Sequence, residues 1–237
     1  MEYSALLVAG GIGTRMGTTI PKQFLLLNEI PVLAHTIRQF WQAKKGMSIV
    51  VVMHSGCLED WETLKNQYFT AEEKENLFVC KGGETRIHSV YNGLLFLKEN
   101  IVQSEAHYVA IHDAVRPFAT KELISNCFET AVAFDSAVPC VPVKSSLRKI
   151  EIENGKTTSY PVKREEYLAV QTPQTFRFSA LWNCFLERTH DNYTDDASLY
   201  QEITGLSVAI VTGEYENIKI TTPEDLLLGE RILKTRS

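Results

Sequence analysis

Regular alternation of buried strands and amphipathic helices is the feature that most constrains the fold of this chain. Ser48–Met53 (SIVVVM) is apolar on both faces, as in a strand that lies between two helix layers. Tyr3–Ala9, Leu77–Cys80 and Tyr108–Ile111 are further apolar runs of strand length, and Pro31–Ala43 has apolar residues at helical spacing. The alternation predicts an α/β fold in which helices flank a mainly parallel sheet.

The rest of the chain continues this pattern, and 237 residues are enough for one large domain, so we expect residues 1–237 to form a single unit. Ala137–Val143 is strand-like but contains Pro139 and Pro142, which suit an edge strand or the exit from a sheet. The further expected helices are Leu58–Phe69, Thr85–Lys98, Thr120–Phe134, Ser179–Arg188, Asp195–Ile203 and Pro223–Lys234, and the further expected strands are Ser207–Thr212 and Asn217–Thr221.

The segment 144–167 interrupts the alternation. Two alternating runs flank Asn154-Gly155, and Asn-Gly is a strong signal for a two-residue hairpin turn. We expect a β-arm that projects from the domain. An isolated hairpin is only marginally stable in water, so the arm either packs back on its own chain or embraces a second subunit.

Composition narrows the function classes. The chain has 24 Lys and Arg against 29 Asp and Glu, a net charge of −5, which argues against a general nucleic-acid binder. No apolar stretch approaches the roughly 20 residues that span a bilayer, and the N-terminus lacks the basic start of a signal peptide. The five cysteines are dispersed and form no CxxC pair, which is typical of reduced core thiols in a cytoplasmic protein.

Ligand sites in parallel sheets lie beyond the carboxyl ends of the strands, so the segments after Ala9, Cys80, Ile111 and Ile220 are the candidates. Ala9–Gly17 (AGGIGTRMG) follows the first strand, and its glycines let backbone N–H groups approach phosphates closely. It matches neither a Walker loop nor the dinucleotide fingerprint. The cations Arg15 and Lys22 beside it favour phosphate binding over a plain tight turn.

Two more strand ends carry polar residues. Gly82–Arg86 (GGETR), followed by Ser89, either hydrogen-bonds a base or ribose or simply caps a helix. Asp113 ends a buried strand, a common position for a carboxylate that holds a metal and a phosphate. His112 is better explained as a structural hydrogen-bonding residue, and no second histidine at ligand spacing supports a zinc site.

Three later segments complete the polar set. They are the stretch from Arg164 through Gln171–Phe176 (QTPQTF), Thr194–Ser198 (TDDAS) and Asn217–Asp225 (NIKITTPED). TDDAS is also a good helix start, with acidic residues in the first turn. Lys219 points either at a site or at solvent. The chain has no Ser/His/Asp order and no cysteine in a nucleophilic context.

Together, AGGIGTRM…PKQ, GGETR…S, HDAVRP, the TPQ segment, TDDAS and NIKITTPED resemble the 2-C-methyl-D-erythritol 4-phosphate cytidylyltransferase family from about Ala5 to Leu233. The resemblance implies a Rossmann-like fold of the sugar-nucleotide transferase superfamily. It implies transfer of a cytidylyl group from CTP to a sugar-alcohol phosphate with release of pyrophosphate, a step of the non-mevalonate isoprenoid pathway. It also implies Mg²⁺ or another divalent cation, and a homodimer that shares its sites through arm exchange.

The resemblance also implies roles for individual residues. Arg15 and Lys22 would stabilise the transition state at the triphosphate, and Arg164 and Lys219 would grip the phosphate of the acceptor, Arg164 coming from the arm of the neighbouring subunit. Nucleotide contacts would come from Ala9, Gly10, Gly11, Ile12, Gly13, Gly83, Glu84, Ser89 and Asp113. Acceptor contacts would come from Arg116, Ser146, Thr172 and Thr194, and Asp113 is the candidate metal ligand.

The chain departs from the family pattern in places. Ser145-Ser146 stands where an Asp-Thr or Asp-Ser pair is common, Lys163 replaces an Asp before Arg164, Glu84 replaces an Asp, and one helix position is His88. These changes affect fine substrate contacts. The alternatives are a ribitol 5-phosphate cytidylyltransferase, a related enzyme for another nucleotide or sugar, and a nucleotide-binding module without catalytic activity.

Overall fold

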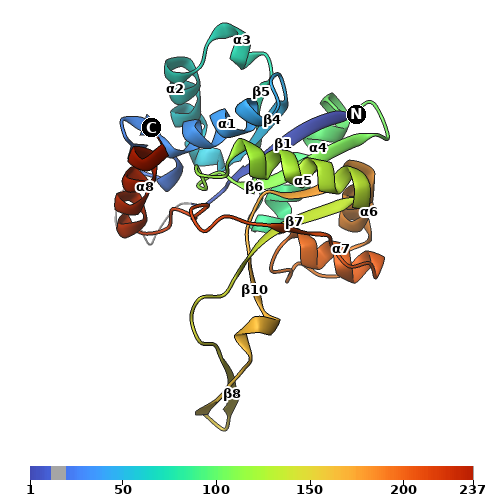
Figure 1. The fold of residues 1–237 in the computed structure, drawn as a ribbon. Coiled ribbons are helices and arrows are strands. Elements are labelled where there is room, and N and C mark those ends of the chain that lie inside the picture. The colour runs from blue at the N-terminus through green and yellow to red at the C-terminus, as the bar shows by residue number, and fades with distance from the viewer. Residues whose placement is uncertain (12–19, 237) are drawn as a thin grey trace.

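The computed structural model describes residues 1–11 and 20–236, and its centre is an eight-stranded sheet in the order β10-β7-β11-β6-β1-β4-β5, with β12 paired to β7 (Figure 1). Four neighbouring strands are parallel, namely β6 (His107–Asp113), β1 (Glu2–Ala9), β4 (Ser48–Met53) and β5 (Leu77–Lys81). The expected α/β fold with a parallel core is confirmed, and the carboxyl ends of these strands meet at one edge.

The other half of the sheet is mixed. β7 (Ser136–Pro142) pairs with β10 (Leu168–Val170) and β11 (Gln174–Arg177) in antiparallel fashion and with β12 (Ile210–Thr212) in parallel. Of the two placements expected for 137–143, the edge strand is wrong, because β7 has a neighbour on each side, whereas the exit from the sheet agrees with the end of β7 at Pro142. Proline lacks only the N–H donor, and the carbonyl of Pro139 still accepts a bond from Gln171 N–H at 2.8 Å.

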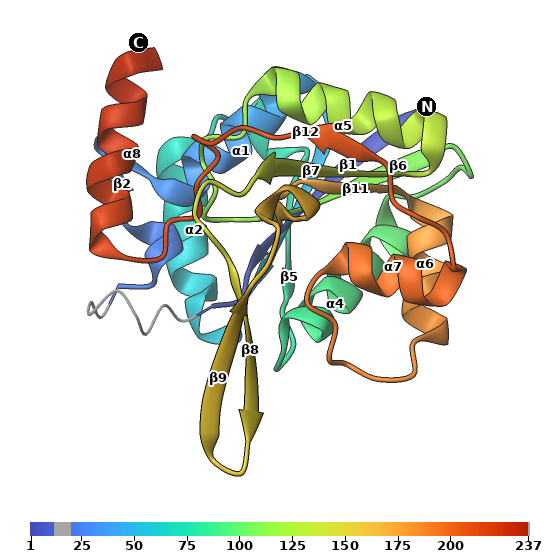
Figure 2. The same ribbon diagram turned by 60° about the horizontal axis from the view of Figure 1, so that its bottom comes forward.

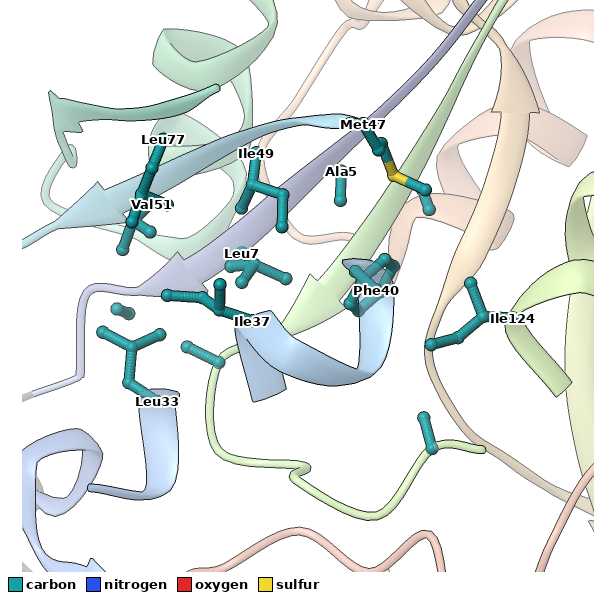
Figure 3. Packing of buried hydrophobic residues seen from close by; sticks show 14 of the residues in the cluster. Ala5, Leu7, Leu33, Ile37, Phe40, Met47, Ile49, Val51, Leu77 and Ile124 are labelled. Carbon is teal, nitrogen blue, oxygen red and sulfur yellow. The ribbon is translucent and has the colours of Figure 1, made fainter. Parts of the chain in front are cut away.

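Helices cover both faces of the sheet, and each strand sends alternate side chains to each layer. Leu7, Ile49 and Val51 pack with α1 (Val32–Ala43), α2 (Leu58–Tyr68) and α5 (Lys121–Phe134), as Figure 3 shows for α1. Leu6, Val50 and Val52 face α4 (Arg86–Asn100), α6 (Phe178–Glu187) and α7 (Asp196–Thr204). The predicted helices are confirmed, because their apolar faces are the ones buried against the sheet.

The remaining elements are short or terminal. The helix α8 (Pro223–Arg236) packs beside β2 (Leu26–Leu27), which pairs with β3 (Ile30–Pro31). The other short elements are α3 (Ala71–Lys74) and the 3-10 turns Lys22–Phe24, Ser55–Cys57 and Arg164–Glu166. None of the described helices is long and apolar enough to cross a membrane.

The predicted strand at Asn217–Thr221 is wrong. Its backbone joins no sheet, because its bonds go to neighbouring loops: Ile220 N–H donates to the carbonyl of Val115 at 2.9 Å, and the side chain of Asn217 donates to the carbonyl of Thr172 at 2.9 Å. The segment is therefore an irregular strap held against the end of β6. It brings Lys219 to the same edge of the sheet as the glycine turns.

The arm has the predicted form. β8 (Arg148–Glu153) and β9 (Lys156–Pro161) are antiparallel and joined by Asn154-Gly155, with φ of 52° and 75° as a type I′ turn requires. The hairpin projects away from the sheet and its helices (Figures 1 and 2). Its apolar side chains Ile150 and Ile152 are 62% and 68% exposed, so the arm does not bury them on its own chain.

All five cysteines are unpaired, and four of them, Cys57, Cys127, Cys140 and Cys184, are buried. Burial raises the pKa of the Cys184 thiol to about 11, so this group stays protonated at neutral pH. The expectation that the cysteines act as small core residues is confirmed for these four. The fifth, Cys80, lies partly exposed on β5.

Candidate active site

The loops that follow β1, β5 and β6 enclose a cavity of about 300 Å³ at the carboxyl edge of the sheet. It gathers residues from five separate segments of the sequence, as expected for a site at the carboxyl ends of parallel strands. Its lining consists of Val8, Ala9, Gly10, Gly11, Lys22, Gln23, Gly83, Glu84, Thr85, Arg86, Ser89, Asp113, Val115 and Lys219.

The first wall is the glycine turn after β1. The buried amide of Gln23 donates to the carbonyl of Ala9 at 3.2 Å and so holds the end of β1. The Lys22 side chain runs along the turn, since a Cβ added to Gly11 would lie 3.7 Å from Lys22 Cε. This places a cation beside exposed backbone, as the sequence predicts for a phosphate site. Ile12, Gly13 and Arg15 lie outside the described residues.

The second wall is the glycine turn after β5. Thr85 caps α4 by accepting a bond from His88 N–H, which confirms the helix-cap interpretation of this motif. Ser89 accepts from Gly83 N–H at 3.1 Å and donates to the carbonyl of Thr85 at 2.9 Å. A Cβ on Gly83 would lie only 2.4 Å from His88 Cβ, so the turn requires glycine there. The Ser89 hydroxyl therefore fixes the turn and also lines the cavity.

The third wall is Asp113 at the end of β6. Its carboxylate accepts a bond from Arg116 Nε at 2.9 Å and pairs with Lys219 Nζ at 3.2 Å. Burial by itself would raise the pKa of Asp113, but the charges of Lys219 and Arg116 outweigh it and hold the pKa well below its usual range. Asp113 is therefore ionised at neutral pH. Lys219 points at the cavity, which answers the question that the sequence left open.

Arg86 also lines the cavity, and sequence reasoning assigned it no role. Its two terminal nitrogens bind both oxygens of Asp196, at 3.0 and 2.6 Å, and the Asp196 side chain is fully buried. Burial disfavours the charge of Arg86, but the Asp196 carboxylate outweighs this effect and raises the arginine pKa. The pair ties the start of α4 to the start of α7. Arg86 directly follows the predicted helix cap at the edge of the sheet, and this is the sequence feature that could have identified it as a cavity residue.

The other predicted residues lie around the cavity or apart from it. Arg116 and Thr172 contact Asp113, through its carboxylate and its N–H, without lining the cavity. Thr194 is exposed before α7, with its hydroxyl 3.3 Å from that of Ser198. Ser146 and Arg164 lie on the arm. Arg164 donates to the carbonyl of Lys144 at 2.8 Å and to Glu165 at 3.2 Å, away from the cavity of its own chain.

The carboxylates of the cavity fit one kind of metal site. No group of three or more His, Cys, Asp or Glu side chains in the described part of the chain could hold an ion without other ligands. Mg²⁺ needs less from the protein, because it binds one or two carboxylates and takes substrate phosphates and waters for the rest. Asp113, ionised and facing the cavity, fits that requirement.

Comparison with known proteins gives one consistent answer. The family model described as "IspD: 2-C-methyl-D-erythritol 4-phosphate cytidylyltransferase" matches residues 3–235. A protein of that name from Porphyromonas gingivalis is 40% identical over 230 residues, which cover 97% of this chain and 96% of that protein.

Two solved structures agree with this result. The 2-C-methyl-D-erythritol 4-phosphate cytidylyltransferase of Thermus thermophilus is 30% identical, with a TM-score of 0.74 over 99% of this chain and 100% of that one. The 4-diphosphocytidyl-2C-methyl-D-erythritol synthase of Anaerococcus prevotii superposes with a TM-score of 0.79 over 98% of both chains, and at 24% identity this likeness bears on the fold alone. The chain belongs to the 2-C-methyl-D-erythritol 4-phosphate cytidylyltransferase family.

Proposed function

We propose that this chain transfers the cytidylyl group of CTP to 2-C-methyl-D-erythritol 4-phosphate, giving 4-CDP-2-C-methyl-D-erythritol and pyrophosphate in the non-mevalonate isoprenoid pathway. One observation carries the proposal: a family member places two glycine turns, two lysines and an ionised aspartate around a single cavity at the sheet edge. Neither the ribitol-phosphate alternative nor a module without activity has a comparable observation in its favour.

The chemistry needs charge control more than proton transfer. A phosphate monoester has its second pKa near 6, so it is largely a dianion at neutral pH and is already a nucleophile. An oxygen of the acceptor phosphate forms a bond to the α-phosphorus of CTP, and the bond from that phosphorus to the bridging oxygen breaks to release pyrophosphate. Lys22 and Lys219 at the cavity reduce the repulsion between the two anions and orient them.

A divalent cation is part of this proposal. Mg²⁺ would be held by Asp113 and by the phosphates of CTP, and when bound it would supply positive charge to the triphosphate. Arg116 and Lys219 already neutralise part of the Asp113 charge, at 2.9 and 3.2 Å. In this proposal Asp113 supplies one ligand, and the phosphates of the substrate and water supply the others.

The reaction itself can be tested by phosphorus NMR of CTP, Mg²⁺ and methylerythritol phosphate incubated with the enzyme. We expect paired diphosphate signals of a CDP-alcohol and a pyrophosphate signal of equal amount. CMP or free phosphate in place of the CDP-alcohol would contradict the proposal, since it would indicate hydrolysis.

Lys219→Ala is expected to impair use of the acceptor more than binding of CTP. Loss of one charged hydrogen bond to the acceptor phosphate corresponds to about 10–100-fold in kcat/KM for that substrate. Steady-state kinetics with each substrate varied, together with direct titration of CTP, measures the difference. Lys234→Ala on the exposed face of α8 is the control. Equal losses for both substrates would remove Lys219 from the acceptor side.

We also propose that two copies of the chain exchange arms, so that Arg164 completes the cavity of the other copy. The arm exposes Ile150, Ile152 and Tyr160. A lone hairpin gains too little stability from its own contacts to offset the exposure of this apolar surface to water. Arg164 lies on the arm, outside the cavity lining of its own chain. A second copy that receives the arm would account for both facts.

A mixed dimer of Lys22→Ala and Arg164→Ala chains tests this arrangement, and each variant alone is expected to be nearly inactive. If the arms are exchanged, one of the two sites in the mixed dimer has both residues intact, and activity returns to about half of the wild-type value. Differently tagged chains, co-expressed and purified through both tags, provide the material. An inactive mixed dimer would show that Arg164 acts within its own chain.

The expected cytoplasmic location belongs to the same proposal. Five unpaired cysteines are typical of a protein that works in a reducing compartment. Cell fractionation with an antibody to the chain tests it, and recovery with the cytoplasmic markers is the expected result.

A further inference from the structure

A buried chain of hydrogen bonds lies directly behind the acceptor side of the cavity. His112 Nε2 is 3.0 Å from the carbonyl oxygen of Arg116, and His112 Nδ1 is 2.9 Å from Thr172 Oγ1. The backbone N–H of Asp113 donates to the same Thr172 oxygen at 3.1 Å. His112 is completely buried and Thr172 is 6% exposed, and neither residue lines the cavity.

We propose that His112 and Thr172 are positioning residues that hold the turn from Asp113 to Arg116, and thereby set the place of Asp113 and Lys219 in the cavity. This inference rests on the proposed function, because it assigns these two residues a part in that reaction. Neither residue contacts the reacting atoms in this role. Thr172 instead acts through the backbone of Asp113, and His112 acts through Thr172 and the backbone of Arg116.

The hydrogen-bond partners determine which atom carries each hydrogen in this network. A carbonyl oxygen only accepts, so His112 Nε2 carries the hydrogen that points at Arg116. In the neutral imidazole Nδ1 then only accepts, so Thr172 donates its hydroxyl hydrogen to it. The remaining bond runs from Asp113 N–H to Thr172 Oγ1. His112 is completely buried and both of its ring nitrogens meet uncharged partners, which favours the neutral ring.

The assignment gives Thr172 a role different from the one that the resemblance implied. Its single hydroxyl hydrogen is used by His112, so it has none to donate to an acceptor phosphate. Its backbone carbonyl accepts from the amide of Asn217 at 2.9 Å, and Arg116 donates to the carbonyl of Asn217 at 2.9 Å. These bonds close a ring through the strap that carries Lys219. The turn after β6 is thus tied to Thr172 directly at Asp113, and through His112 and Asn217 at Arg116.

Kinetics of paired threonine variants tests the inference. Thr172→Val keeps the shape and removes the hydroxyl, and we expect about a 10–100-fold loss of kcat/KM for the acceptor phosphate, because small displacements of aligned groups are costly. Thr172→Ser restores the hydroxyl and is expected to recover most of the loss. Thr175→Val is the matched control, since the buried Thr175 hydroxyl has no partner among the described residues. Wild-type kinetics in Thr172→Val would overturn the inference.

Coupling between the two residues gives a second readout. If His112 acts through Thr172, then His112→Asn combined with Thr172→Val loses about as much activity as the worse single variant. If the activity losses of the two single variants multiply in the double variant, the two residues act separately. That result would overturn the proposal that His112 acts through Thr172. Urea denaturation of each variant confirms that the kinetics are measured on folded protein. If His112→Asn does not fold, the Thr172 series still decides the question.

Nitrogen NMR of histidine-labelled enzyme separates this inference from the proposed function. We expect a single His112 tautomer with the hydrogen on Nε2 at pH 7, and a mixture of forms in Thr172→Val. A His112 hydrogen on Nδ1 in the wild type would overturn the proposed role of His112 and Thr172 even if the enzyme is fully active. A wild type that shows the expected tautomer but transfers no cytidylyl group would overturn the proposed function. The hydrogen bonds between His112, Thr172 and the turn would then remain as a structural finding.

Discussion

Replacing Lys22 by alanine is expected to lower kcat by about 10²–10³-fold, the usual effect of removing one preorganised group that stabilises transition-state charge. Lys22 runs along the glycine turn at Gly11 and lines the cavity, where the triphosphate is proposed to bind. Charge builds up on the α- and β-phosphates as the bond to pyrophosphate breaks, so the loss should fall mainly on kcat. Steady-state rates and a direct titration of CTP measure the two effects.

The control for this variant is Lys81→Ala. Lys81 ends β5 at the same edge of the sheet, but it is exposed and does not line the cavity. We expect its kinetics to match the wild type. Normal turnover in Lys22→Ala would remove this residue from catalysis. The resemblance predicts that Arg15→Ala behaves like Lys22→Ala.

Arg86→Met is expected to lower the free energy of unfolding by about 3 kcal/mol, because it leaves a buried carboxylate without its partner. The estimate lies at the low end of the range for buried pairs, since the Arg86 side chain is 32% exposed and water can screen part of the interaction. Asp196 itself is fully buried and bound through both oxygens. Urea denaturation measures the change.

Arg177→Met supplies a matched control. Arg177 and Asp135 are also 2.6 Å apart, but both side chains are exposed by more than a third, so we expect a loss of at most about 1 kcal/mol. Combining Arg86→Met with Asp196→Ala should recover part of the loss, because the unpaired charge is gone. If Arg86→Met lowers the free energy of unfolding no more than Arg177→Met does, the buried ion pair of Arg86 and Asp196 does not have the stabilising role described.

Much of the fold was predictable because its signals are local. The four parallel strands are apolar on both faces, and the helices have apolar faces at the expected spacing. The burial of these apolar side chains therefore determines where the strands and the helices form. The arm was predictable from Asn154-Gly155, whose two positive φ angles few other residue pairs adopt without strain. Asn217–Thr221 misled because its alternating apolar residues, Ile218 and Ile220, pack against α8 and the end of β6 without any strand pairing.

The candidate site was partly predictable for a similar reason. Strand ends converge on one edge of a parallel sheet, so the order of strands and motifs along the chain is enough to place Gly11, Lys22, Gly83 and Asp113 together. The pairing of Arg86 with Asp196, 110 residues apart, depends on how α4 and α7 pack, and no local signal encodes it. The same is true of the bonds that join His112 to Thr172.

Pyrophosphate release from CTP and Mg²⁺, measured in parallel with methylerythritol 4-phosphate and ribitol 5-phosphate as acceptors, separates the proposed reaction from its alternatives. The proposed function predicts turnover with methylerythritol 4-phosphate and little or none with ribitol 5-phosphate. Turnover with ribitol 5-phosphate alone would contradict it, and so would tight CTP binding without pyrophosphate release for either acceptor.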